Sequence, residues 1–383
     1  MKDLYSKLFV LIIIGISMCG GSSLYAQDSL RTGIKYGFLP ALSFNSDNGV
    51  YLGAEVKRYD YRDMVPFRSY TRFAFSYQTI GVFNFSVYRD QVKNFGTDIR
   101  VGYDLNTNQS FSDYHLGDTE KNPVDRPRFD STSYYNFKAF KVNVGGSTRF
   151  PISLGEGIER MDLLTGLRFV YEKPWGTPEN RYLYEQDLTG ADGAFLTFLE
   201  LGWVLERRNN EFRAQQGYYV NAGTKIAPPL ISTHTTAEFY TTMLGYLPIF
   251  KDDPSLTLAG IVRLRSTVGD TPYWFMPYLG DGSTLRGYMY RRFSSDNSLS
   301  YSVELRSWLL KIPFKNIELG VNLFADGGRV FTNENWDSIF NEHKLTLGFG
   351  GVMSIFTPDY ILKYDIGFSD DGIGIYLGTG YSF

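Results

Sequence analysis

The sequence is almost devoid of cysteine and histidine. Its single cysteine is Cys19, and its only histidines are His115, His234 and His343, which lie far apart in the chain. One cysteine allows no disulfide within the chain, and isolated histidines do not have the spacing of metal ligands. We therefore predict no metal site, no cofactor and no enzymatic activity.

A strong charge of either sign is also missing, as are long apolar runs outside the N-terminus. The formal net charge is −3, and the pI of about 5.8 gives no basic field for nucleic acid. No later stretch approaches the roughly 20 apolar residues that a transmembrane helix needs. The mean hydropathy of −0.21 is likewise too polar for a helical membrane protein. The composition therefore argues against nucleic-acid binding and a helical membrane fold.

The N-terminus has the layout of a secretory signal peptide. Two lysines precede an apolar stretch from Leu8 to Met18, which small residues follow. We predict a signal peptide over residues 1–26 and a mature chain over 27–383. The alternative is a lipoprotein anchored through Cys19, which the preceding methionine disfavours.

Tyrosine, phenylalanine and glycine are abundant, with 29, 30 and 39 residues. This composition suits a transmembrane β-barrel, which has aromatic girdles and a crowded polar interior. The end of the chain alternates strictly, and its apolar set, predicted to face lipid, is Ile373, Ile375, Leu377, Thr379, Tyr381 and Phe383. A strand of a soluble sandwich would alternate too, but aromatic residues at its free end would make a sticky edge. We therefore favour the membrane barrel.

Sixteen segments of this kind can be placed, separated by polar, glycine or proline residues. They are roughly 34–45, 50–60, 68–79, 81–93, 95–106, 134–150, 158–173, 194–207, 216–228, 232–247, 255–269, 298–311, 316–326, 343–356, 360–370 and 373–383. Long connections follow odd segments only, as expected if the chain starts in the periplasm. Lipid requires every backbone amide to be paired. We therefore predict an all-β fold, a closed antiparallel transmembrane barrel of about 16 strands.

The sixth external loop carries the most specific motif, Leu285-Arg286-Gly287-Tyr288. Three other stretches occur in a matching order along the chain: Glu206 to Asn210 with Gln216-Gly217-Tyr218, the Glu304-x-Arg306 pair, and Phe324-x-Asp326-x-Gly328. With these motifs and its terminal Phe383, the sequence resembles the barrel domain of the BamA/TamA outer-membrane assembly superfamily, also called the bacterial surface antigen family. The likeness covers about residues 194–383 well and the earlier strands by pattern only.

The resemblance implies that the sixth loop folds into the lumen. The loop-anchoring residues would be Leu285, Arg286, Gly287, Tyr288, Glu304, Arg306, Phe324 and Asp326. Alternation turns Glu304 and Asp326 inward, because the apolar residues beside them face lipid. We expect Arg286 to pin the loop through bidentate hydrogen bonds to Asp326, with Glu304 and Phe324 lining its seat. The alternative is a solvated external arginine above a wet channel.

The resemblance also implies a location in the Gram-negative outer membrane and a role in inserting barrels or passing polypeptides across it. Tyr381 and Phe383 resemble the family's insertion signal, and a weak seam would join segments 34–45 and 373–383. Family members with insertase activity carry periplasmic POTRA domains, for which this chain has no room. We therefore expect contact with outer membrane lipid and with periplasmic or outer-membrane partner proteins that supply the missing POTRA function.

The sequence leaves three other functions open. A passive or selective pore for solutes or lipid would need an open lumen. A surface-binding barrel would use the long loops 107–133 and 174–193. An outer-membrane hydrolase would need a histidine with a catalytic partner, and neither His234 nor His343 has an obvious one in the sequence.

Overall fold

A computed structural model of the chain describes residues 32–45, 49–62, 67–78, 82–92, 99–110, 114, 115, 132, 134–152, 161–176, 179–250, 253–312, 317–355 and 357–383. The predicted signal peptide, residues 1–26, lies outside these ranges. Within them, no helix has the length and apolar character needed to cross a membrane.

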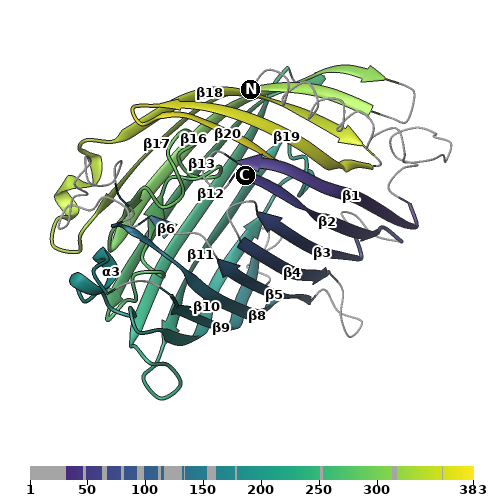
Figure 1. Cartoon of the computed structure of the whole chain (residues 1–383). Coiled ribbons are helices and arrows are strands. Elements are labelled where there is room, and N and C mark those ends of the chain that lie inside the picture. Colours follow the sequence, from purple (N-terminus) through teal and green to yellow (C-terminus); the bar gives the residue numbers. More distant parts are fainter. Residues whose placement is uncertain are drawn as a thin grey trace.

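One antiparallel sheet of sixteen strands dominates the fold, and its strands follow one another around a barrel (Figure 1). In order they are β1 (Ile34–Asn45), β2 (Gly49–Asp60), β3 (Ser69–Gln78), β4 (Val82–Gln91), β5 (Arg100–Ser110), β8 (Ala139–Ile152), β9 (Met161–Pro174), β10 (Ala194–Glu206), β11 (Gly217–Ala227), β12 (Thr236–Phe250), β13 (Asp253–Gly269), β16 (Asn297–Ile312), β17 (Ile317–Phe331), β18 (Lys344–Ile355), β19 (Thr357–Ser369) and β20 (Gly372–Thr379). The sixteen predicted segments correspond to these strands one for one, which confirms the all-β antiparallel class.

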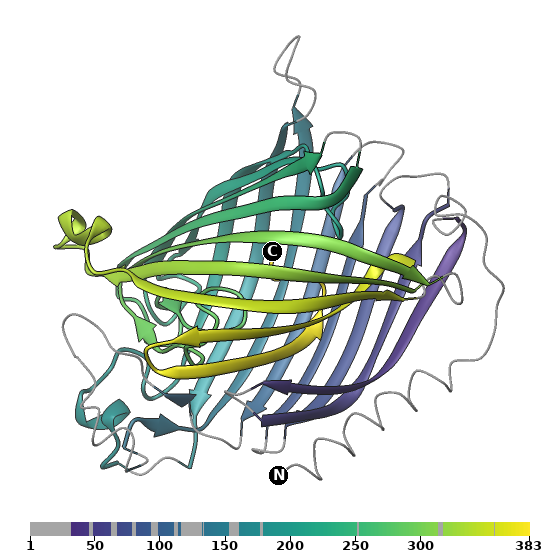
Figure 2. The same ribbon diagram turned by 90° about the horizontal axis from the view of Figure 1, so that it is seen from above.

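Among the described residues, the connections contain a few short elements. These are the pairs β6 (Tyr114–His115) with β7 (Asn136–Phe137) and β14 (Tyr278–Leu279) with β15 (Phe293–Ser294), the helix α3 (Tyr182–Glu185) and the 3₁₀ helix η2 (Trp336–Phe340). All of them lie in connections at one end of the sheet, which we call the long-loop end. The opposite end, where β1 begins and β20 ends, is the short-turn end (Figure 2).

Pairing is extensive everywhere except between the first and last strands. β1 pairs with β2 along its whole length. Among the described residues, it shares a single register pair with β20, Asn45 with Tyr376, at the end of β1 nearest the loops. We call this junction the seam. In the part of the chain that the structure describes, one register pair thus connects the first strand to the last.

The two faces of the sheet differ in chemistry, as the alternation predicts. On β10, Leu199, Leu201 and Trp203 are exposed on the outer face. On β17, Asn322 and Asp326 are buried on the inner face. An apolar outer band suits lipid. Buried charges require partners, so the charged side chains of the inner face must be paired with opposite charges.

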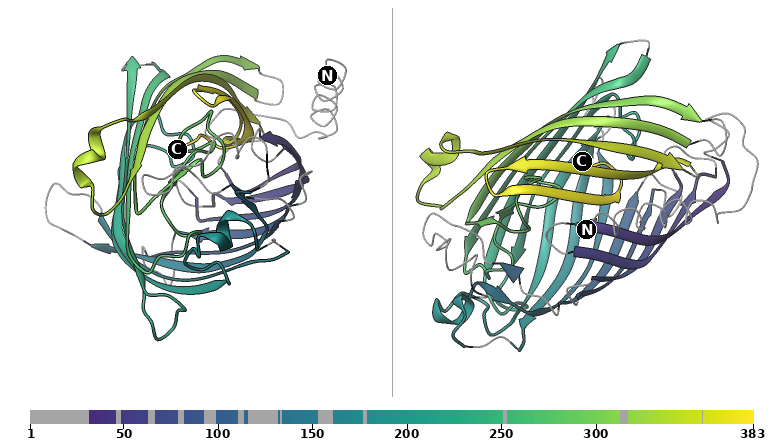
Figure 3. Two further views of the ribbon diagram at one scale, coloured as in Figure 1. Left: turned by 60° about the vertical axis from the view of Figure 1, so that its left-hand side comes forward. Right: turned by 45° about the horizontal axis from the view of Figure 1, so that its top comes forward.

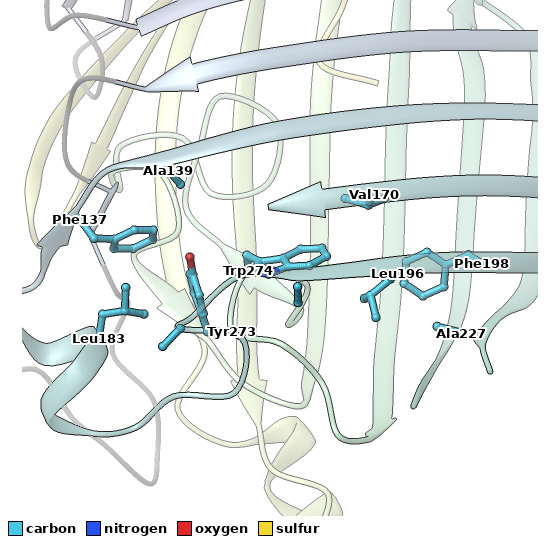
Figure 4. Close-up of a cluster of buried hydrophobic side chains, with 11 residues drawn as sticks. Phe137, Ala139, Val170, Leu183, Leu196, Phe198, Ala227, Tyr273 and Trp274 are labelled. Atoms are coloured by element: carbon cyan, nitrogen blue, oxygen red, sulfur yellow. The ribbon is translucent and has the colours of Figure 1, made fainter. Parts of the chain in front are cut away.

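Several connections fold inside the ring of strands, which Figure 3 shows in its left-hand view. Near the long-loop end, Tyr273 and Trp274 from the connection between β13 and β16 pack against Phe137, Leu183 and Phe198 (Figure 4). Beside this cluster lies a cavity of about 280 Å³, lined by Asn84, Asn106, Phe137, Lys141, Asn143, Glu172, Tyr273, Trp274, Tyr290 and Arg291. The connection therefore covers part of the interior rather than extending away from the sheet.

Candidate functional site

The loop that carries Arg286 is shaped by its own sequence. A carboxylate oxygen of Asp281 accepts hydrogen bonds from the backbone N–H groups of Ser283 and Thr284, both at 2.7 Å. Such a turn is a common conformation for aspartate, because its short side chain can reach nearby amides. The turn directs the next residues, Leu285 and Arg286, onto the inner face of the sheet.

Arg286 is almost fully buried, with 1% of its surface exposed, and binds three carboxylates. Its Nε and Nη2 donate to the two carboxylate oxygens of Asp326 at 2.9 and 2.6 Å, which is a bidentate pair. Its Nη1 donates to Glu304 at 2.5 Å and to Asp365 at 3.4 Å. The backbone N–H of Arg286 also donates to Asp326, at 3.1 Å. Both main chain and side chain are thereby fixed.

Two further cations complete the charge balance of this group. Nε of Arg306 donates to Glu304 at 2.7 Å, and Nζ of Lys363 donates to Asp365 at 3.0 Å. With Arg286 and Asp326, the group has three cations and three carboxylates. A balanced and hydrogen-bonded set is the form in which charges can be buried at low cost.

An aromatic ring lines one side of the pocket that holds the Arg286 side chain, which we call the seat. The guanidinium carbon of Arg286 lies 3.4 Å from the ring centroid of Phe324. A guanidinium stacks on such a ring through cation–π attraction. Glu304 and Phe324 are directly opposed on β16 and β17, so the sheet register itself assembles the seat.

The residues flanking Arg286 fit closely against the sheet. Leu285 and Tyr288 belong to a small buried cluster that includes Val330 of β17. Gly287 has a φ of +109°, a conformation that favours glycine. A Cβ on Gly367 of β19 would lie 2.5 Å from the carbonyl oxygen of Arg286. The glycines therefore let the two backbones approach closely.

The chain terminus does not run as the sequence predicts. β20 ends at Thr379, and the next residues turn to the inner face, so the prediction that Tyr381 and Phe383 face lipid is wrong. Nη2 of Arg306 donates to the carbonyl oxygen of Phe383 at 3.0 Å. The rings of Tyr381 and Phe383 lie 4.0 and 4.6 Å from the Arg306 guanidinium carbon. A role for Tyr381 and Phe383 as an insertion signal stays a prediction.

The physical reason for this turn is the buried arginine. Arg306 offers both aromatic rings a cation–π partner and offers the terminal residue a hydrogen-bond donor. Ser382, between the two aromatic residues, accepts a hydrogen bond from Nη1 of Arg286 at 3.2 Å. The terminus and the loop are therefore joined on the inner face of the sheet.

Sequence reasoning missed four members of the site, which are Ser302, Lys363, Asp365 and Ser382. Asp365 and Ser302 both contact Arg286, Ser302 at 3.2 Å from Nη2. The alternation held the signal for Asp365, because it lies between Tyr364 and Ile366 on a strand and therefore faces inward.

The sequence analysis also missed an interaction between a histidine and an aspartate at the long-loop end. Nδ1 of His234 lies 2.5 Å from one carboxylate oxygen of Asp270, and the other oxygen accepts a hydrogen bond from Thr189 at 3.1 Å. The hydrogen bond with His234 lowers the pKa of Asp270. The described residues contain no group of three or more side chains placed to hold a metal ion.

Comparison with known proteins identifies the family. Residues 70–383 match the model of the Omp85 superfamily domain. The chain belongs to the Omp85 superfamily. The resemblance drawn from the loop and strand motifs is thereby confirmed, because the BamA/TamA barrels are of this kind. A comparison with curated proteins finds no match.

Solved structures of Omp85 barrels have a similar fold. BamA from Haemophilus ducreyi lacking POTRA domains 1–3 matches with a TM-score of 0.59 and 14% identity, over 91% of this chain and 70% of that one. CdiB from Escherichia coli matches with a TM-score of 0.61 and 10% identity, over 94% of this chain. CdiB from Acinetobacter baumannii matches with a TM-score of 0.55 and 12% identity, over 91% of this chain. The match spans 64% and 59% of the two CdiB chains.

Membership of the Omp85 superfamily gives the general class of function. The chain is an outer-membrane barrel related to protein insertion and secretion factors. The family consists of transport and assembly barrels, so the prediction that the chain is not an enzyme is confirmed.

Proposed function

We propose that this Omp85 barrel inserts or exports polypeptides at the outer membrane, with its short-turn end in the periplasm. The observation that carries the proposal is the seam, where β1 and β20 share one register pair although β1 pairs fully with β2. A sheet edge with a short register to its neighbour is a place where an incoming strand can pair. In lipid every backbone group must be paired, so a strand of the cargo would pair with β1 or β20 if the short register between them opened.

In this proposal the barrel is closed in the resting state, and its sixth loop acts as an internal support. Arg286 joins β16, β17 and β19 through their carboxylates and contacts the residue before the terminus. The wall beside the seam is thereby held in one shape. At the other end of β20, a Cβ on Gly378 would meet only a lysine carbon at 3.9 Å, so this part of the strand is lightly packed.

The cargo and its delivery are part of the same proposal. Protein is the favoured cargo, and lipid is the alternative that the same seam would admit. The barrel would contact outer membrane lipid through its apolar outer face. Periplasmic or outer-membrane partner proteins would capture the cargo, which is the role that POTRA domains fill in other members of the superfamily.

A passive pore is the competing function. The inner face holds the sixth loop and the terminal residues, so the interior is partly filled. We expect small and unsteady conductance in planar bilayers, whereas a large and steady single-channel conductance would favour the pore.

The deciding experiment is depletion of the protein in its native host, followed by quantification of the outer-membrane proteome by mass spectrometry. A broad loss of other barrels supports a part in general assembly. Loss of one protein only supports a dedicated exporter. An unchanged proteome with normal growth contradicts the proposal.

A further inference from the structure

The connection between β10 and β11, residues 207–216, folds inward at the short-turn end. We call it the strap. The side-chain oxygen of Asn210 accepts hydrogen bonds from the backbone N–H groups of Phe212 and Arg213, both at 2.8 Å. The side-chain oxygen of Asn209 accepts from the backbone of Gln215 at 3.0 Å. Asparagine forms such local turns readily. Residues 211–213 therefore project from a bend that is already shaped.

One side of the strap is bound to the early strands. Both carboxylate oxygens of Glu211 accept hydrogen bonds from Arg100 of β5, at 2.7 and 2.8 Å. The ring of Phe212 lies among three aromatic rings from the region of β2 and β3, with centroid distances of 5.7, 5.6 and 5.4 Å to Tyr59, Phe67 and Tyr70. An ion pair thus holds Glu211, and an aromatic cluster holds its neighbour Phe212.

The other side of the strap is bound to the late strands. Nη1 of Arg213 lies 2.5 Å from a carboxylate oxygen of Glu318 on β17, and its guanidinium carbon lies 3.7 Å from the ring centroid of Trp308 on β16. Ala214 is 5% exposed and belongs to a buried cluster against which Phe383 packs. The strap therefore reaches both the late strands and the inward-turned terminus.

The strap lies on the side of the barrel opposite the seam, and its contacts reach across the barrel. β10 and β11 are the eighth and ninth strands in the order around the barrel, so they lie opposite the seam. From there, the side-chain amide of Asn210 donates to Asp359 of β19 at 3.3 Å. Asp359 also accepts a hydrogen bond at 3.0 Å from the hydroxyl of Tyr61, directly after β2. The strap therefore crosses the opening of the barrel at the short-turn end, which we call the mouth. It contacts residues on both sides of the seam.

Side chains replace backbone pairing in this part of the seam. A Cβ on Gly37 of β1 would lie 2.7 Å from the ring of Tyr360 on β19, so the ring lies against the β1 backbone. Nζ of Lys57 on β2 lies 4.7 Å from the centroid of the same ring. Contacts of this kind can separate without breaking a β-ladder.

We propose that the strap closes the periplasmic mouth of the barrel and latches the seam, by holding β2 and β19 together. The latch must leave before the seam can widen or a segment can enter the lumen from the periplasm. Turns at the rim of a sheet are ordinarily solvated. A turn whose charges are paired and largely shielded from water on opposite walls is instead stabilised in a single position. The proposal does not depend on which cargo the barrel handles.

The test follows the reactivity of one buried position. Ala214→Cys changes little volume and, in a Cys19→Ser background, is the only thiol in the chain. Labelling by a water-soluble maleimide is measured for the purified barrel in lipid nanodiscs. Gln216→Cys, at an exposed position of the same strap, gives the rate of an open site. We expect Ala214→Cys to react much more slowly than Gln216→Cys.

The strap is then loosened by the double substitution Glu211→Gln and Arg213→Gln, with Gln216→Ala as the matched control. Removing partners from buried pairs should speed labelling of the Ala214→Cys thiol about 100-fold. Amide hydrogen exchange in β1 and β19 should quicken with it, and the control should change neither. Folding is checked by the heat-dependent mobility of the barrel on gels, and Glu211→Gln alone serves if the double variant does not fold.

Three results would overturn the proposal. Equal labelling of Ala214→Cys and Gln216→Cys would mean that the strap is not seated. Unchanged labelling in the loosened variant would mean that these charges do not hold it. Faster labelling with unchanged exchange in β1 and β19 would refute the latch.

Discussion

Replacing Arg286 with alanine should release the sixth loop from the inner face of the sheet. The substitution removes the hydrogen bonds to Asp326, Glu304 and Asp365 at distances of 2.5 to 3.4 Å. It leaves three carboxylates facing one another with only Arg306 and Lys363 to balance them. Removing one partner of a buried ion pair costs about 3–5 kcal/mol.

Most of this cost should favour an unseated loop, because water can then hydrate the carboxylates. Each 1.4 kcal/mol is a factor of ten in an equilibrium. Cleavage of a transiently opened segment follows the population of the open form. We therefore expect cleavage within residues 270–296 to be about 100- to 3000-fold faster in the variant.

The assay is limited proteolysis of the folded barrel in nanodiscs with proteinase K, because trypsin would lose a site at the substituted position. Arg68→Ala is the matched control, since Arg68 is exposed at the short-turn end. Arg286→Lys should fall between wild type and alanine, because lysine keeps the charge without the bidentate geometry. Cleavage of Arg286→Ala at the rate of the control would refute the reasoning.

Three further predictions follow from the same contacts. Asp326→Asn should loosen the loop more than Asp365→Asn, because the loop arginine bonds to Asp326 at 2.6 and 2.9 Å but to Asp365 at 3.4 Å; proteinase K cleavage rates compare them. Gly367→Ala should unseat the loop in the same assay, whereas Gly378→Ala, whose Cβ would meet only a lysine carbon at 3.9 Å, should not; equal effects would contradict the close fit. Asp270 has a lowered pKa, so its stabilisation is present above the ordinary aspartate pKa and is lost as pH falls through the lowered value. Asp270→Asn should cost under about 1 kcal/mol at neutral pH and nothing at low pH in thermal unfolding, since the side chain is 57% exposed.

Alternation along each strand determined the sheet and the direction of its side chains. Asn322, Phe324 and Asp326 fall on the inner face of β17 because their neighbours Val321 and Leu323 are apolar and exposed. This pattern is local, since successive side chains on a strand point to opposite faces. The sequence could therefore place sixteen strands, a wall of carboxylates that faces inward, and a loop arginine that can pair with these carboxylates.

The end of the last strand was not encoded in that pattern. The alternation continues through Tyr381 to Phe383, yet β20 ends at Thr379. What turns the terminus inward is Arg306, which is distant in sequence and reaches Phe383 only after the barrel has formed. A periodic pattern indicates which face of a strand a residue prefers. It does not indicate a distant residue, such as Arg306, that binds the last residues and ends the strand early.

The strap and the seam likewise depend on the tertiary structure. Residues 207–216 have the composition of an ordinary polar turn, and nothing local shows that Glu211 will meet Arg100 and that Arg213 will meet Glu318. These contacts join strands from opposite sides of the barrel, so they exist only once the sheet has curved around them. The sequence by itself determined the strands, their faces and the family. Closure of the sheet decided which buried charges and rings meet, because those partners lie far apart along the chain.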